Sequence, residues 1–121
     1  MSRDEKLPLL IGALLAALGV LFGAFGAHGL RNALTPEALG WWQTGVQYQM
    51  WHAIGLVALG AARLPGTRLS VWFLTLGTLL FSGSLYVMAL TGARWLGMVT
   101  PVGGVLLIAG WVCLSLKLLR R

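Results

Sequence analysis

The stretch LPLLIGALLAALGVLFGAFGA, residues 7–27, carries no charged or polar side chain. A helix needs about 20 predominantly apolar residues to cross a hydrocarbon core of about 30 Å, and this stretch has that length. The apolar part of a secretory signal covers only about 7 to 15 residues. We therefore expect a retained membrane helix here and not a cleaved leader.

The composition of the whole chain points the same way. Of its 121 residues, 58% are hydrophobic and 10% are charged, and the mean hydropathy is +0.83, whereas a soluble domain is about 25% charged. The net charge of +6 comes from basic residues scattered at the ends of apolar runs, so we expect no nucleic-acid partner. Cys113 is the single cysteine, which excludes an intrachain disulfide.

Cutting the chain at its charges and turn residues gives four apolar segments, at residues 7–27, 44–63, 69–90 and 101–118. We predict an all-α fold, a polytopic four-transmembrane-helix bundle that forms a single domain over residues 1–121. Residues 36–43 extend the second segment at the outer membrane interface. In TPEAL and TPVGG, Thr35 and Thr100 are expected to cap the helices that follow them.

The basic residues also predict an orientation. One side of the membrane would hold seven of them: Arg3, Lys6, Arg63, Arg68, Lys117, Arg120 and Arg121. The other side would hold only Arg31 and Arg94. Since cytoplasmic flanks are enriched in Lys and Arg, both termini are expected in the cytoplasm.

Small residues recur every three or four positions along the first predicted helix, which places them on one stripe of its surface. They are Gly12, Ala16, Gly19, Gly23 and Gly26. Pairs of small residues at this spacing let a neighbouring backbone approach closely. Glycines can also form a hinge or gate, but we interpret this stripe as a helix-packing surface.

Polar side chains gather in the outer half of the predicted membrane domain. At about 1.5 Å per helical residue, His52 lies about 16 Å and Gln49 about 21 Å from the cytoplasmic boundary. The pocket candidates are His28, Tyr48, Gln49, His52, Ser82, Tyr86 and Thr100. Because polar groups facing lipid are costly, we expect Gln49 and His52 to bond Ser82, Tyr86 or carbonyls near the glycines. These bonds either only hold the helices together or line a binding pocket.

His28 falls two residues after Gly26, on the opposite side of an uninterrupted helix. We therefore expect the helix to end or loosen within FGAHG, with Gly26 or Gly29 as a left-handed cap. His28 would then turn over the polar outer end, either as a titrating group or as a partner of loop backbone.

Five motifs carry a family resemblance: GAFGAHGL, TPEAL, TGVQYQMWHAIGL, FSGSLY and TPVGG, in that order. Together they resemble the small four-helix membrane proteins called domain of unknown function 423 or uncharacterised protein family 0382, which include the animal transmembrane protein 256. Members commonly have YQMYHA where this chain has Trp51. The resemblance implies a multi-pass protein of the bacterial inner membrane and implies no activity.

Three classes of function follow from these residues. A non-catalytic binding or assembly module is our preferred interpretation, with membrane lipid, a second copy or another membrane protein as partner. A small-solute or proton-coupled transporter, acting as an oligomer, is the alternative, since intramembrane His and Gln occur in such proteins.

An enzyme or metal protein fits least well. The only acids, Asp4, Glu5 and Glu37, lie outside the predicted spans, so no general acid or base pair is available there. The two histidines differ in depth by about 17 Å on the helical rise, which prevents them from ligating one haem iron. We expect no cofactor and no metal.

Overall fold

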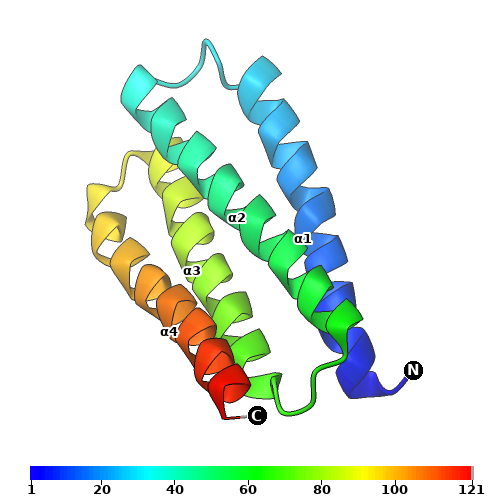
Figure 1. Ribbon diagram of the computed structural model, residues 1–121. Helices are drawn as coiled ribbons and strands as arrows, with labels where there is room; N and C mark the ends of the chain where they lie inside the picture. The colour runs from blue at the N-terminus through cyan, green and yellow to red at the C-terminus, as the bar shows by residue number, and fades with distance from the viewer. Residues whose placement is uncertain (121) are drawn as a thin grey trace.

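The computed structural model describes residues 1–120. It contains α1 (Arg3–His28), α2 (Pro36–Ala62), α3 (Arg68–Thr91), a short 3-10 helix η1 (Arg94–Met98) and α4 (Thr100–Leu119). Consecutive long helices run in opposite directions, so the two ends of the chain lie at the same end of the molecule (Figure 1). The all-α prediction is confirmed, and the predicted segments 7–27, 44–63, 69–90 and 101–118 each fall largely within one long helix.

Local capping explains where the first two helices begin. Ser2 accepts a hydrogen bond from the Glu5 amide, and Glu5 accepts one from the Ser2 amide. This capping box starts α1 four residues before Leu7. Thr35 caps α2 as predicted, and α2 runs unbroken from Pro36, so the interfacial extension is the first part of the same helix.

The prediction that Thr100 caps α4 is wrong. Residues 94–98 form a 3-10 turn that leads directly into α4, so Val99 already has right-handed helical backbone and no side chain caps the helix. The Thr100 hydroxyl instead donates to the Leu96 carbonyl at 3.3 Å and lies 2.6 Å from the Ser84 hydroxyl. It joins α4 to α3.

The helices pack in a row and not in a closed ring. α1 lies along α2, α2 along α3 and α3 along α4, while α1 meets α3 only marginally. Within the described residues α1 and α4 do not pack against each other, and Figure 1 shows them at the two edges of the row. The four-helix assembly is therefore open on one side.

Three stretches are long and apolar enough to cross a membrane: Arg3–His28, Arg68–Thr91 and Arg94–Leu119. α2 has comparable length, but Gln47, Gln49 and His52 lower the hydropathy of its middle. The surface of the row carries large exposed apolar side chains, among them Leu14, Leu21, Val105 and Ile108. The chain is thus a helical protein with apolar spans.

Candidate functional site

Gln49 joins three helices through one side-chain amide. Its nitrogen Nε2 donates to the Leu15 carbonyl of α1 at 2.8 Å, and its oxygen Oε1 accepts from the Tyr86 hydroxyl of α3 at 2.6 Å. The side chain is only 3% exposed. The sequence predicted bonds of both kinds for Gln49, to Tyr86 and to a carbonyl near a glycine.

A glycine of α1 exposes the carbonyl that Gln49 bonds. A side chain at position i+4 of a helix lies over the carbonyl of residue i, because each Cβ tilts toward the N-terminus. Gly19 follows Leu15 by four residues, and a Cβ on Gly19 would lie 3.6 Å from the Gln49 amide nitrogen. Its absence leaves the carbonyl open to Gln49.

A second glycine of α1, seven residues after Gly19, exposes another backbone carbonyl in the same way. The indole nitrogen of Trp42 donates to the Phe22 carbonyl at 2.8 Å, and Gly26 follows Phe22 by four residues. A Cβ on Gly26 would lie 2.7 Å from that indole nitrogen. The Trp42 ring also packs on the rings of Phe22 and Tyr86, with centroid distances of 5.7 and 4.7 Å.

Ser82 adds a second link between α2 and α3. Its hydroxyl donates to the Gly45 carbonyl at 2.7 Å. A Cβ on Gly45 would lie 2.7 Å from the Tyr86 ring, so this glycine makes room for the tyrosine that bonds Gln49. Gly45, Gln49, Ser82 and Tyr86 therefore form one interlocked set.

His52 bonds one backbone carbonyl, a kind of partner that was expected, and one side chain that was not expected. Its Nδ1 lies 2.7 Å from the Tyr48 carbonyl of its own helix, and its Nε2 accepts from the Trp111 indole at 3.0 Å. A carbonyl only accepts and an indole N–H only donates, so these partners select the neutral ring with its proton on Nδ1. Of the partners expected for His52, Ser82 and Tyr86 are not bonded, because the side chain turns toward α4, and the backbone carbonyl that it bonds is that of Tyr48.

Trp111 was not predicted as a partner for His52. It lies 59 residues away on α4, and a single indole N–H on an apolar ring gives no pattern along the sequence. Gly55 provides the space for the ring, since a Cβ there would lie 3.1 Å from it. The bond connects α2 and α4, whose backbones do not pack directly on each other.

Tyr48 is half-buried beside His52. Its ring lies parallel to the His52 ring, at 6.2 Å and 9°, and packs on Phe81 with a centroid distance of 4.3 Å. Thr100 lies apart, in its pair with Ser84. We call Gln49, His52, Ser82 and Tyr86 the polar layer.

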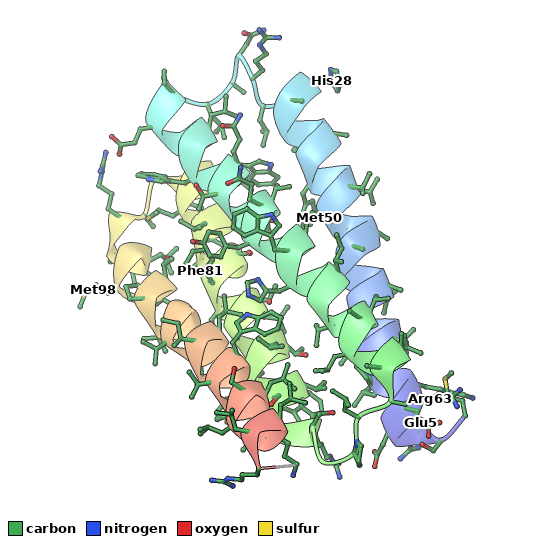
Figure 2. All side chains as sticks on the ribbon, viewed as in Figure 1. Glu5, His28, Met50, Arg63, Phe81 and Met98 are labelled. Carbon is green, nitrogen blue, oxygen red and sulfur yellow. The ribbon has the colours of Figure 1, made fainter. Side chains whose placement is uncertain are left out.

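His28 lies outside the polar layer, so the expectation that it turns over the polar outer end is wrong, but α1 does end within FGAHG with Gly29 as its cap, as predicted. α1 remains helical through His28, and Gly29 caps it with right-handed backbone (φ −86°, ψ −38°). The amides of Gly29 and Leu30 both bond the Phe25 carbonyl, which closes the helix without a left-handed residue. The imidazole is exposed and points away from the other helices (Figure 2).

The polar layer is packed. Among the described residues, every buried side-chain nitrogen and oxygen has a hydrogen-bond partner. Two cavities lie at opposite ends of the molecule, and neither is lined by a polar-layer residue. No group of three His, Cys, Asp or Glu gathers in the described chain. The arrangement is suited to joining helices.

The two histidines are expected to differ in their effect on stability. His52→Ala should lower the free energy of unfolding by about 1 to 3 kcal/mol, because it leaves the Trp111 indole without its acceptor. His28→Ala should stay within about 0.5 kcal/mol of the parent, since that ring is exposed. Equilibrium unfolding in mixed detergent micelles measures both. A loss confined to His28→Ala would contradict the assignment.

A row of apolar helices joined by buried side-chain hydrogen bonds is typical of helical membrane proteins. The chain belongs to the family described as protein of unknown function (DUF423), whose model matches residues 22–104. The resemblance seen in the sequence motifs is thereby confirmed.

Relatives match the chain over most of its length. UPF0382 membrane protein SH2409 of Staphylococcus haemolyticus is 44% identical over 117 residues, covering 93% of this chain and 94% of the relative. UPF0382 membrane protein YwdK of Bacillus subtilis is 45% identical over 112 residues, covering 88% and 91%. UPF0382 inner membrane protein YgdD of Escherichia coli K12 is 42% identical over 122 residues, covering 96% and 92%. No solved structure matches the chain.

Proposed function

We propose that all four long helices cross the bacterial inner membrane, with both termini in the cytoplasm. The end that holds the termini carries six described basic residues: Arg3, Lys6, Arg63, Arg68, Lys117 and Arg120. The opposite end carries Arg31 and Arg94, and Arg121 lies outside the described residues. This asymmetry is typical of a cytoplasmic face. α2 can serve as a span because Gln49 and His52 turn inward and bond protein groups.

Within that topology we propose a non-catalytic binding and assembly module. The observation that carries this proposal is the saturated polar layer, in which the buried polar groups bond one another and the backbone. A transporter needs a central site that opens alternately to the two sides. An enzyme needs an acid or base free to move a proton. Groups fully bonded between helices meet neither requirement.

Binding is therefore assigned to the periphery of the molecule. Lipid is the expected partner of the exposed apolar faces, on which Leu14, Leu21, Val105 and Ile108 lie. The open side of the row, between α1 and α4, is where a second copy or another membrane protein would pack. The ends of the molecule carry the described cavities.

A set of single-cysteine variants in a Cys113→Ser background tests both proposals. Ser82→Cys, at a side chain only 2% exposed, should resist a small membrane-permeant thiol reagent, because a sealed layer admits no water. Thr91→Cys, exposed at the outer end, is the reactive control. Reaction of Ser82→Cys with impermeant reagents from either side would support a transporter and overturn the module.

The same set reports topology. In intact cells an impermeant maleimide should label Thr91→Cys and leave Leu119→Cys unlabelled until the membrane is permeabilised. Leu119 is 80% exposed at the end with the termini, so its protection reflects its side of the membrane and not burial. The reverse labelling pattern would place both termini outside.

A further inference from the structure

A cavity of about 320 Å³ lies at the end of the molecule that holds both termini. Its walls come from the start of α1, the end of α2, the connection 63–67 and the start of α3. The volume lies within the range of about 300 to 1,000 Å³ that small-ligand pockets occupy. The cavity has no part in the polar layer.

Charges of both signs line this end cavity. Asp4 and Glu5 face it from α1, and Arg63 and Arg68 face it from the other wall. Figure 2 shows Glu5 and Arg63 near each other at this end. Yet the ion pair within the described residues joins Glu37 to Arg94, at the opposite end. The two carboxylates and two guanidinium groups of the end cavity thus share one space without pairing.

Apolar side chains form another part of the lining, which sits where a membrane boundary would fall. Pro8, Leu59 and Val71 are buried residues that contribute to its walls. Trp72 lines it as well and remains 38% exposed. Tryptophan at the end of a span is typical of the headgroup level. The end cavity combines charged residues with apolar wall residues. A ligand with a polar head and an apolar body requires this combination.

We propose that the end cavity binds the headgroup of a zwitterionic aminophospholipid, of the phosphatidylethanolamine class. The phosphate lies between Arg63 and Arg68, since guanidinium groups match phosphate oxygens in geometry and charge. The primary ammonium lies between the carboxylates of Asp4 and Glu5. The Oε2 atom of Glu5 already accepts a hydrogen bond from the Ser2 amide, and its Oε1 atom is available to accept one from the ammonium. The glycerol end of the lipid lies on the apolar wall.

Charge complementarity selects this lipid among the common headgroups. An anionic headgroup such as phosphatidylglycerol satisfies the arginines but leaves the carboxylates facing its phosphate. A choline headgroup brings a positive charge without N–H donors for the carboxylates. The aminophospholipid satisfies both pairs. The inference rests on the proposed function in one respect, that this end of the molecule lies at a membrane boundary.

The test compares lipids retained by the full chain. Protein reconstituted in vesicles of equal parts phosphatidylcholine, phosphatidylethanolamine and phosphatidylglycerol is released in mild detergent, and bound lipid is counted by native mass spectrometry. The parent should retain phosphatidylethanolamine about fivefold over phosphatidylcholine, the ratio expected of one additional hydrogen bond, since choline carries the same charge but no N–H donor.

Two variants at exposed positions separate the two halves of the site. Asp4→Asn should lower the preference for ethanolamine over choline, because only the Glu5 carboxylate then remains for the ammonium, and should raise the retention of phosphatidylglycerol. Arg68→Gln should lower the retention of phosphatidylethanolamine and of phosphatidylglycerol alike, by about fivefold. Glu37→Gln and Arg31→Gln make the same charge changes at the opposite end and should behave as the parent.

Equal retention of the three lipids by the parent, or an unchanged ethanolamine preference in Asp4→Asn, would overturn the proposal. Displacement of the lipid by millimolar inorganic phosphate would assign the cavity to a soluble anion and would also overturn it. The thiol reactivity of Ser82→Cys is a separate measurement. A failed lipid preference with an unreactive Ser82→Cys would reject the lipid site and leave the sealed module standing.

Discussion

Gly103→Ala should separate α4 from α3, whereas Gly104→Ala, one position along, should leave the fold intact. A Cβ on Gly103 would collide with the backbone nitrogen of Phe81 and lie 2.8 Å from its Cα and 2.9 Å from the Gly77 carbonyl. Backbone atoms cannot rotate aside as the end of a side chain can. The expected loss is at least about 3 kcal/mol, the upper range for overpacking.

Gly104→Ala is a close control because it makes the same chemical change in the same helix. A Cβ there would lie 3.8 Å from the Phe81 ring, an ordinary contact. Because alanine has a higher helix propensity than glycine, the free energy of unfolding of Gly104→Ala should equal that of the parent or exceed it by up to about 1 kcal/mol. Thermal melting in detergent compares the two. Equal melting temperatures would mean that α4 does not approach α3 as closely as described.

Gln49→Leu should destabilise the protein by about 2 kcal/mol. It leaves the Tyr86 hydroxyl without its acceptor in the interior and frees the Leu15 carbonyl of its second partner. Leucine has similar volume, so the loss reports hydrogen bonding more than cavity formation. Measured interhelical hydrogen bonds in membranes average about 0.6 kcal/mol, which makes the two bonds of Gln49 a large contribution.

The matched control is Gln47→Leu, two residues earlier on the exposed side of α2. It should stay within about 0.5 kcal/mol of the parent or gain stability in a lipid environment. Unfolding in mixed micelles measures the pair. A Gln49→Leu variant as stable as Gln47→Leu would remove Gln49 from the structural core.

Much of the helix layout could be predicted from the sequence, because its signals are local. Apolar length, the cap at Thr35 and the break at residues 63–67 each depend on neighbours a few positions away. The spacing of Gly19 and Gly26 likewise marks one face of α1, and both lie against α2 side chains. Helical periodicity depends only on residues close together in the chain, so a single sequence is enough to detect it.

The partners across helices were harder to predict. The side chain of Trp42 reaches a backbone carbonyl, and that of Trp111 reaches His52 from the far edge of the row. Each ring carries a single N–H donor on an apolar body, so neither residue type indicates a polar contact, and Trp42 near the start of α2 is typical of an interfacial anchor. His28 was misplaced for a related reason, since the way Gly29 closes α1 depends on where the 29–35 connection leads.

The same limit applies to the site. The residue types of the polar layer were visible in the sequence, but whether they enclose a pocket or bond one another depends on distances of a few ångströms between helices. The end cavity was not foreseen, because its charges come from segments some sixty residues apart, at Asp4 and at Arg63 and Arg68. In the sequence alone, isolated charges at helix ends indicate membrane orientation and not a shared binding site.

The coupling free energy between Gln49 and Tyr86 tests the central claim, that the polar layer binds the helices to one another. It is obtained from a double-mutant cycle with Gln49→Leu, Tyr86→Phe and the double variant, each unfolded in mixed micelles. The account predicts strongly non-additive losses with a coupling of about 1 kcal/mol, because both single variants break the same 2.6 Å bond. Additive losses would contradict it, since they would mean that the two side chains face separate surroundings, such as an open pocket.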